Sequence, residues 1–227
     1  MGRALFITGT GTDVGKTYVT GLMVKKLAQA GRNPGYYKAA MSGNARQEDG
    51  SLIPGDALYV RQVSGIAQPL EEMCPYVYEN AWSPHLAARA EGNPVSLDVV
   101  KRGYGAVCAR YDYVTVEGSG GILCPIRFDE TQLWLEDVVK ELGLSSVIVA
   151  SAGLGTINSV VLTAEYMRAQ GLPVKGMIFN HFHPGDRMEE DNLAMCQLRT
   201  GLPILARVKD GDAELEMDAD VLCALYE

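Results

Sequence analysis

The chain has 227 residues, of which 47% are hydrophobic and 21% are charged, and its formal net charge is −8. This length and composition suit one globular domain over residues 1–227 that buries a substantial core, and they exclude a low-complexity or fibrous chain. The excess of acidic residues argues against binding to nucleic acid and against docking on anionic membranes.

Six short runs rich in β-branched and aromatic residues predict strands, and amphipathic stretches between them predict helices. The strands are expected at Ala4–Thr8, Gly35–Lys38, Tyr113–Glu117, Ser146–Ala150, Gly176–Asn180 and Pro203–Val208. The helices are expected at Lys16–Ala30, Ser96–Tyr111, Leu133–Leu142, Thr156–Gln170, Glu190–Thr200 and Asp218–Tyr226. Buried strands that alternate with helices predict an α/β fold, a doubly wound and mainly parallel sheet.

Residues 41–94 are the least regular part of the chain and are rich in Gly, Pro, Ser and Asn. The pattern allows a helix at Asp56–Ser64 and a strand at Met73–Tyr78 within this region. Because long loops inside a compact domain are often functional, we expect substrate contacts here.

The segment Gly9–Thr17, which follows the first strand and opens the first helix, predicts a phosphate-binding loop. Its glycines let backbone N–H groups surround phosphate oxygens at a helix N-terminus. Lys16 would reach the β- and γ-phosphates of ATP, and the Thr17 hydroxyl would ligate Mg²⁺. The pattern GxxxxGK[ST] fails only where Thr10 replaces its first glycine. The loop therefore predicts a P-loop NTPase-like domain that uses ATP and Mg²⁺.

Three charged residues, two at predicted strand ends and one at a predicted helix start, are candidates for the same site, each with an ordinary alternative. Glu117 could bind Mg²⁺ as a Walker-B acid does, or cap the next element. Asp56 could bind the metal or be a helix N-cap. Lys38 could be a second cation for phosphate charge or a solvated surface lysine. Ligands gather beyond the carboxyl ends of parallel strands. We therefore expect convergence at one edge of the sheet of the polar residues in Gly9–Thr17, Lys38, Glu117, Ser151–Asn158 and Asn180.

Cysteine and histidine spacing gives no sign of a structural metal or of disulfides. The five cysteines lack CxxC spacing, and the three histidines do not sit with them at zinc-site spacing. No apolar stretch approaches the roughly 20 residues that span a bilayer. We therefore expect reduced thiols in a cytoplasmic protein without membrane contact.

Seven segments, in order and spacing, resemble the dethiobiotin synthase family of biotin biosynthesis. The matching segments are Thr8–Thr17, Tyr37-Lys38 with Ser42-Gly43, Asp56-Ala57, Ser83–Ala88, Val116–Gly121, Leu154–Asn158 and Asn180. The resemblance implies an ATP- and Mg²⁺-dependent ligase that joins CO₂ to 7,8-diaminononanoate and closes the cyclic urea of dethiobiotin. It further implies a carbamate and a carbamic–phosphoric anhydride as intermediates.

The resemblance also implies roles for individual residues. The catalytic residues would be Lys16, Lys38, Thr12 and Ser42, and the metal would be held by Thr17, Asp56 and Glu117. The cofactor-binding residues would be Gly11, Thr12, Asp13, Val14, Gly15, Lys16, Thr17, Asp56, Glu117, Gly118 and Asn180, the last at the adenine. The substrate would contact Thr12, Lys38, Ser42, Leu154, Gly155, Thr156, Ile157 and Asn158.

In this resemblance the segment Leu154–Asn158 presents helix N-terminal N–H groups to the distal carboxylate of the substrate. It does so from the neighbouring subunit, so a homodimer with a substrate site shared across the interface is implied. Three positions depart from the family pattern: Asp13 where Glu is usual, Ala39 where Pro is usual, and Ser159 where His is frequent. The segment after Arg207 matches poorly, and no nucleotide contact is assigned to it.

Two other functions are compatible with a phosphate loop of this form. One is a switch ATPase of the partition and septum-placement type, but such ATPases carry an extra lysine where this chain has Gly11. The other is the synthetase half of a glutamine-dependent amidase, for which a partner chain would have to supply the glutaminase.

Overall fold

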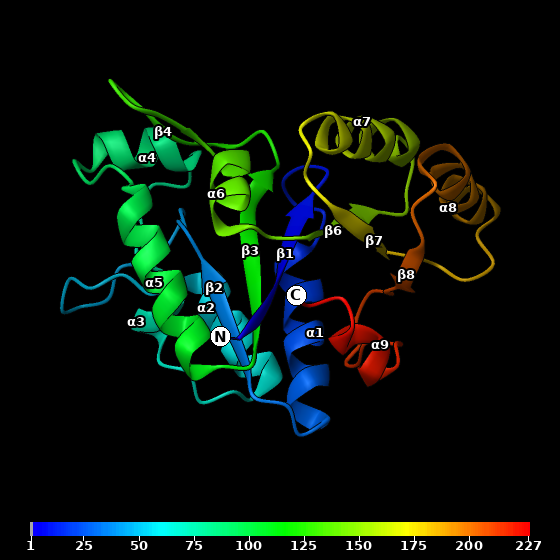
Figure 1. Cartoon of the computed structure of the whole chain (residues 1–227), viewed down its shortest axis with the longest axis horizontal. Helices are drawn as coiled ribbons and strands as arrows, with labels where there is room; N and C mark the ends of the chain where they lie inside the picture. Colours follow the sequence, from blue (N-terminus) through cyan, green and yellow to red (C-terminus); the bar gives the residue numbers. More distant parts are fainter. Residues whose placement is uncertain (1) are drawn as a thin grey trace.

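A six-stranded sheet runs through the molecule in the order β2-β3-β1-β6-β7-β8, and every neighbouring pair of strands is parallel (Figure 1). The computed structural model describes residues 2–227. The strands are β1 (Arg3–Gly9), β2 (Pro34–Lys38), β3 (Tyr113–Gly121), β6 (Ser146–Ser151), β7 (Val174–Asn180) and β8 (Ile204–Arg207). The predicted α/β fold is therefore confirmed.

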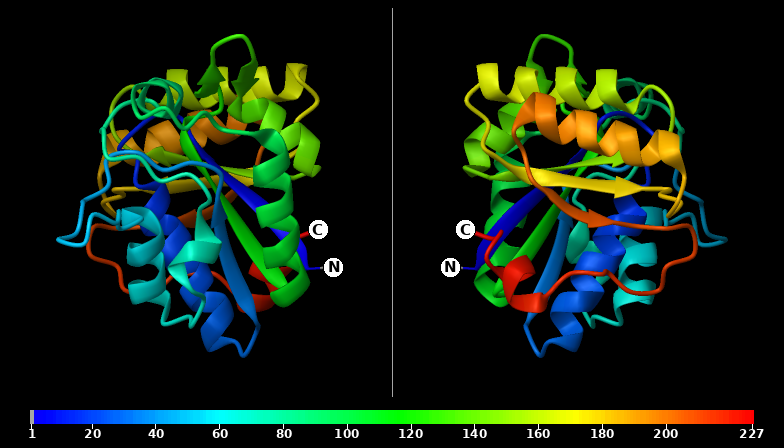
Figure 2. Two further views of the ribbon diagram at one scale, coloured as in Figure 1. Left: turned by 90° about the vertical axis from the view of Figure 1, so that its left-hand side faces the viewer. Right: turned by 90° about the vertical axis from the view of Figure 1, so that its right-hand side faces the viewer.

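Helices cover both faces of this sheet, as its two side views show (Figure 2). One face carries α1 (Lys16–Gln29), α2 (Gly55–Ser64) and α9 (Ala219–Cys223). The other face carries α5 (Leu97–Arg110), α6 (Leu135–Leu142), α7 (Thr156–Ala169) and α8 (Arg187–Thr200). No helix in residues 2–227 combines the length and the apolar character that crossing a bilayer requires.

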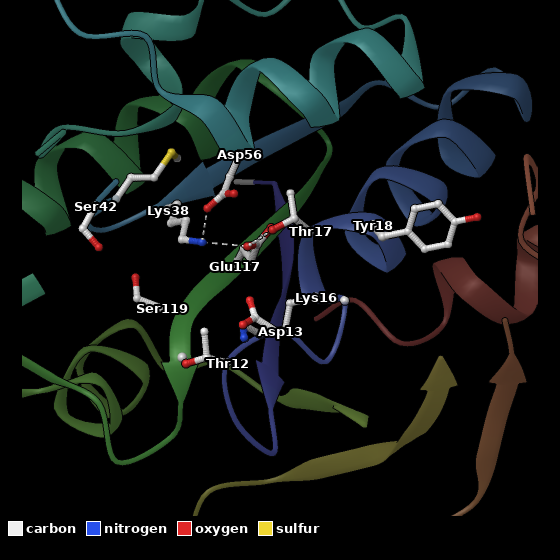
Figure 3. Close-up of a pocket in the computed structure, with 13 residues that line it drawn as sticks. Thr12, Asp13, Lys16, Thr17, Tyr18, Lys38, Ser42, Asp56, Glu117 and Ser119 are labelled. Atoms are coloured by element: carbon white, nitrogen blue, oxygen red, sulfur yellow. Dashed lines mark hydrogen bonds and ion pairs between the residues drawn. The ribbon is translucent and has the colours of Figure 1, made fainter. Parts of the chain in front are cut away.

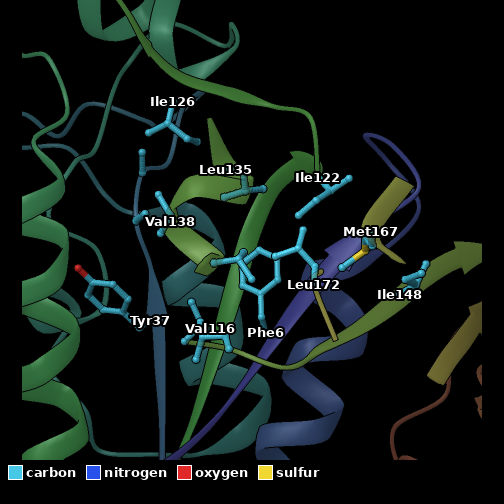
Figure 4. Packing of buried hydrophobic residues seen from close by; sticks show 14 of the residues in the cluster. Phe6, Tyr37, Val116, Ile122, Ile126, Leu135, Val138, Ile148, Met167 and Leu172 are labelled. Atoms are coloured by element: carbon cyan, nitrogen blue, oxygen red, sulfur yellow. The ribbon is translucent and has the colours of Figure 1, made fainter. Parts of the chain in front are cut away.

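Alternate residues of each strand supply the two cores between sheet and helices. Phe6 and Ile148 belong to the cluster under α5–α8 (Figure 4), whereas Leu5 and Val147 belong to the cluster under α1 and α9. Side chains alternate with a period of two along a strand, so both faces of the strand are buried here. This explains why the strands read as continuous apolar runs.

The irregular region contains short elements that the sequence pattern does not reveal. They are α3 (Leu70–Met73) and α4 (Pro84–Ala90). Outside this region, an antiparallel hairpin of β4 (Pro125–Phe128) and β5 (Gln132–Trp134) is a further unpredicted element. The predicted strand at Met73–Tyr78 is wrong. Met73 ends α3, and the following residues make only an isolated bridge between Met41 and Val77.

The outer edge of β2 is occupied by a side chain, which explains why no further strand forms there. The side chain of Gln68 accepts a hydrogen bond from the backbone N–H of Tyr36 at 2.7 Å and donates one to its carbonyl at 3.0 Å. A side-chain amide thus takes the pairing positions that another strand would need. Gln68 is buried, so these bonds are shielded from water.

Helix boundaries differ from the prediction where a side chain caps the helix or a strand takes its first residues. Helix α6 begins at Leu135 because Gln132–Trp134 pairs with β4. Helix α8 begins at Arg187, because the Asp186 carboxylate accepts hydrogen bonds from two N–H groups of its first turn. Helix α9 spans only Ala219–Cys223.

Strand register places the candidate site. Lys38 at the end of β2 pairs with Glu117 of β3, and Ile7 of β1 pairs with Glu117 from the other side. The phosphate loop follows β1 directly. Three neighbouring strand ends therefore bring Lys38, Glu117 and the loop to one edge of the sheet.

Candidate active site

A cavity of about 330 Å³ lies at the carboxyl ends of β1, β2 and β3 (Figure 3). Its lining comes from the phosphate loop, the start of α1, the ends of β2 and β3, and α2. The lining residues are Thr12, Asp13, Gly15, Lys16, Thr17, Tyr18, Lys38, Met41, Ser42, Asp56, Glu117, Ser119 and Gly120. All seven residues predicted to be catalytic or metal-binding line this cavity.

The phosphate loop leads into α1 through a glycine that no other residue can replace easily. Gly15 is the N-cap of α1 with φ of 84°, a left-handed conformation that favours glycine. A Cβ atom at this position would lie 2.0 Å from Nδ2 of Asn180. No side chain caps the helix, so the N–H groups of its first turn remain available to an anion.

Lys16 begins α1 with its ammonium turned back onto the loop. Its Nζ donates a hydrogen bond to the Gly11 carbonyl at 2.9 Å. Burial, together with the nearby charge of Lys38, lowers the pKa of Lys16 from its ordinary value. A polyphosphate in the cavity would offset both effects by supplying negative charge to this ammonium.

Lys38 is the centre of an ionic network inside the cavity. Its Nζ lies 2.7 Å from Oε1 of Glu117 and 2.6 Å from Oδ2 of Asp56, and Thr17 donates to the same Oε1 at 2.8 Å (Figure 3). Although burial lowers the pKa of Lys38, the two carboxylates raise it above its ordinary value. Lys38 is therefore a buried cation, and its interpretation as a solvated surface charge is wrong.

Asp56 lies in the first turn of α2 without capping that helix. The N-cap residue is Pro54, and no side chain makes a cap hydrogen bond. The Asp56 carboxylate turns instead to Lys38. The N-cap interpretation of Asp56 is thus wrong, and its carboxylate belongs to the cavity.

The far oxygen of Glu117 has a partner of its own. Tyr36 donates its phenolic hydrogen to Oε2 of Glu117 at 3.2 Å. Burial, and then the charge of Glu117, raise the pKa of Tyr36 well above its ordinary value, so the phenol keeps the proton that it donates. Glu117 is itself only 1% exposed.

The donor set fits a magnesium ion. Two carboxylates and a hydroxyl supply oxygen atoms, which are the ligands that Mg²⁺ prefers. The two carboxylates converge on the Lys38 ammonium, which shows that one positive charge is accommodated between them, and the Thr17 hydroxyl bonds to Oε1 of Glu117 beside it. Thr17, Asp56 and Glu117 could therefore hold a divalent cation once Lys38 moves aside.

Asn180, at the end of β7, lies against the phosphate loop. Its Nδ2 donates to the Val14 carbonyl at 3.3 Å, and its Oδ1 is buried without a protein partner among the described residues. An amide with one free acceptor beside the loop can recognise a base that offers an N–H donor.

The segment Leu154–Asn158 does not line this cavity. It lies at the start of α7 and borders a separate apolar groove between α7 and α8, together with Leu162 and Leu198. Leu154 is 89% exposed and Leu198 is 76% exposed. The structure therefore separates this predicted substrate segment from Thr12, Lys38 and Ser42 of the same chain.

Sequence reasoning assigned no role to Ser119 or Tyr36. The Ser119 side chain borders the cavity (Figure 3), and its Oγ donates to the Ala40 carbonyl at 2.7 Å. Tyr36 precedes Lys38 by two residues on the same strand. Because side chains alternate along a strand, this spacing puts both on one face, and that signal could have identified Tyr36.

Comparisons with known proteins agree on one family. The family model described as "AAA domain" matches residues 3–213. The ATP-dependent dethiobiotin synthetase BioD of Brachyspira hyodysenteriae is 49% identical over 95% of this chain and 96% of that protein. The proteins of that name from Clostridium perfringens (strain 13) and Clostridium botulinum (strain Loch Maree) are 45% and 41% identical, over 92% and 100% of this chain and 91% and 99% of their own lengths.

Several solved structures share this fold at low sequence identity. The MinC:MinD cell division complex of Aquifex aeolicus matches with a TM-score of 0.58 and 14% identity, over 92% of this chain and 81% of that one. A ParA family ATPase from Chlorobium tepidum matches with a TM-score of 0.56 and 14% identity, over 98% and 88%. At this identity the likeness establishes only the P-loop NTPase fold.

Proposed function

The chain belongs to the dethiobiotin synthetase family of ATP-dependent ligases, and on that premise we propose that it carboxylates 7,8-diaminononanoate with CO₂ and closes the cyclic urea of dethiobiotin. The observation that carries the proposal is the buried network of Lys38, Asp56, Glu117 and Thr17 beside the phosphate loop. ATP and Mg²⁺ are the proposed cofactors.

The proposed chemistry has three steps that balance in atoms and charge. One amine of the substrate attacks CO₂ and loses a proton, which gives a carbamate. A carbamate oxygen then attacks the γ-phosphate of ATP, so ADP leaves and a carbamic–phosphoric anhydride forms. The second amine attacks the carbonyl carbon and loses a proton, inorganic phosphate leaves with that oxygen, and the ring closes.

Positive charge and hydrogen-bond donors are what the second step requires, because a carbamate and a polyphosphate are both anions. Lys16 and the first-turn N–H groups of α1 would bind the phosphates. Lys38, once released from its carboxylates, would neutralise the reacting oxygens, with Thr12 and Ser42 as hydrogen-bonding partners in the same cavity.

Thr17, Asp56 and Glu117 are the proposed metal ligands, and Asn180 is the proposed adenine contact. The bound Mg²⁺ would supply charge neutralisation at the β- and γ-phosphate oxygens. The ammonium of Lys38 shows where positive charge is stabilised between the two carboxylates. The free Oδ1 of Asn180 supports the base contact.

A homodimer with a shared substrate site is the proposed assembly. The support is the exposed apolar groove between α7 and α8, which begins at Leu154–Asn158 and contains exposed Leu162 and Leu198. Large apolar side chains gathered on one face favour association with another protein surface. Covering this groove with a second copy would bring one chain's α7 N-terminus toward the other chain's substrate.

The experiment mixes the protein with ATP, Mg²⁺, the diamine and ¹⁸O-labelled CO₂ at short reaction times. We expect mass spectrometry to find the cyclic urea, with one labelled oxygen in the released phosphate because the carbamate oxygen leaves with phosphorus. Phosphate without label would contradict the anhydride. Phosphate release that ignores the diamine would favour a switch ATPase instead.

A further inference from the structure

Two adjacent tyrosines of β2 are equally buried but serve different partners. Tyr36 and Tyr37 are both 0% exposed. The Tyr36 phenol donates to Oε2 of Glu117, whereas the Tyr37 phenol donates to the carbonyl of Val100 in α5 at 2.8 Å. The Tyr36 phenol therefore lies on the sheet face of the candidate active site, and the Tyr37 phenol lies in the core between the sheet and α5.

The two oxygens of Glu117 are held by different groups. Oε1 accepts from Thr17 and from the Lys38 ammonium. Within residues 2–227, Tyr36 is the hydrogen-bond donor to Oε2. Glu117 is only 1% exposed, so the Tyr36 phenol takes the place that water would have at Oε2.

We propose that Tyr36 is a positioning residue for the metal site: it fixes the Glu117 carboxylate so that Oε1 stays directed at Thr17 and at the cation position. This inference rests on the proposed function, in which Glu117 holds the metal. Tyr36 itself touches neither substrate nor nucleotide, since it does not line the cavity.

Strand geometry explains why this tyrosine can reach the carboxylate. In the parallel register, Tyr36 pairs with Thr115 and Lys38 pairs with Glu117, so all four side chains share one face of the sheet. The phenol therefore reaches along that face from one residue pair to the next. Tyr37, one residue on, points to the other face and cannot substitute for it.

Loss of the phenol hydrogen bond would strengthen the hold of the Lys38 ammonium on the Glu117 carboxylate, with which the metal must compete. With Phe at position 36, the buried Oε2 has no donor, and the carboxylate can rotate to share both oxygens with the Lys38 ammonium. The metal then displaces an ammonium that is held more firmly, and it binds to a carboxylate that is less well oriented. Metal affinity falls, while the groups that touch the reacting atoms remain in place.

The test compares Tyr36→Phe with Tyr37→Phe in the complex of protein and ADP. Each variant removes one buried phenolic hydroxyl from the same strand, so their losses of stability should be similar. Mn²⁺ binding, followed by the electron paramagnetic resonance signal of the free ion, should weaken about 10-fold in Tyr36→Phe, the scale seen when a partner of a metal ligand is removed. The Mn²⁺ affinity of Tyr37→Phe should stay within about twofold of the parent value. At saturating Mg²⁺, kcat of Tyr36→Phe should fall by less than about fivefold, because the metal site is then filled.

Each other outcome decides something different. If Glu117→Gln weakens Mn²⁺ binding but Tyr36→Phe does not, the positioning role is wrong and the metal site stands. If Glu117→Gln also leaves Mn²⁺ binding unchanged, the metal assignment of the proposed function fails. Equal weakening in Tyr36→Phe and Tyr37→Phe would mean general loosening of β2 and would overturn the inference.

A second pair of variants covers the case in which Tyr36→Phe does not fold. Incorporation of 4-fluorophenylalanine or 4-aminophenylalanine at position 36 fills the space of the phenol in both proteins, but only the amino group can donate. Mn²⁺ should bind more tightly to the amino variant than to the fluoro variant. Equal affinities would overturn the inference.

Discussion

Lys16 is the residue whose loss should disable ATP use most directly. Its ammonium lies at the phosphate loop, 2.9 Å from the Gly11 carbonyl. A hydrogen bond to a charged group contributes about 1.5–3 kcal/mol, so Lys16→Ala should weaken ATP binding by more than about 10-fold. Calorimetric titration with ATP measures the dissociation constant.

The control is Lys26→Ala, in the last turn of the same helix, which should bind ATP as the parent protein does. Unchanged ATP binding by Lys16→Ala would remove the phosphate-loop assignment.

Lys38 should affect turnover more than nucleotide binding, because its charge is needed where a carbamate meets the γ-phosphate. Lys38→Ala should lower kcat far more than it raises the ATP dissociation constant, as expected for an interaction made mainly in the transition state. Equal losses in binding and turnover would contradict this role.

The structure adds a stability effect to the same substitution. Removing Lys38 leaves Asp56 and Glu117 facing each other without a cation. Breaking a buried ion pair in this way costs about 3–5 kcal/mol, discounted here because the Asp56 side chain is 36% exposed. Urea unfolding without metal should show that loss, and added Mg²⁺ should restore part of it if the metal occupies the same place.

Individual site residues differ in how far the sequence predicts them. Lys16 and Thr17 follow from a local motif, because the loop and the helix start are contiguous in the chain. The choice between roles for Lys38 and Asp56 depends on burial and on a contact between β2 and α2, which no local pattern encodes. In the structure the side chains of Lys38 and Asp56 both lie in the cavity, so the surface-charge and N-cap interpretations are wrong. Their catalytic and metal-binding roles stay predictions.

At the scale of elements, the Gln68 side chain should be essential to the edge of β2. Gln68→Leu leaves the buried N–H and carbonyl of Tyr36 without partners. An unsatisfied buried polar group costs about 1–3 kcal/mol, so the free energy of unfolding should fall by at least about 2 kcal/mol. Gln29→Leu removes an exposed hydrogen bond to Glu214 and serves as the control. A fall of the same size in both variants would show that the edge contact contributes nothing specific.

Elements that repeat the strand–helix alternation are the ones that the sequence predicts well. The six strands of the main sheet are continuous apolar runs, long helices lie between them, and both are buried in the cores on the two faces of the sheet. The hairpin of β4 and β5 was missed because each strand is too short to show a period. The strand expected at Met73–Tyr78 has suitable residues, but Met73 ends α3 and the segment pairs only through the isolated bridge of Val77 with Met41.

At the scale of the whole molecule, the proposed dimer can be tested by complementation. Lys16→Ala disables the phosphate loop, and a variant of Thr156 and Asn158 disables the carboxylate contact of α7. If each substrate site combines one chain's loop with the other chain's α7, random mixing of the two inactive proteins should recover about a quarter of the parent activity. Demonstrated subunit exchange without recovery would exclude the shared site. An active monomer would exclude the dimer itself.

Assembly is also where the sequence is least informative. The groove between α7 and α8 consists of exposed residues such as Leu162 and Leu198, spaced along helices whose other faces are buried. Periodicity alone cannot separate an apolar face that packs within the chain from one that packs on a partner. The dimer was therefore implied by family resemblance rather than by pattern, and it stays a prediction.

The central position of β1 has a consequence for the order of folding. Its neighbours β3 and β6 are synthesised long after it, and Thr17 and Glu117 are separated by 100 residues in the chain. Pairings between distant segments form slowly, because the entropy of closing the intervening chain must first be overcome. A nascent chain that ends before β3 has its phosphate loop and α1, but neither Glu117 nor the strand that holds the loop in place. Recovery of nucleotide binding during refolding should consequently lag behind recovery of helical structure, which makes ATP a late reporter of the native topology.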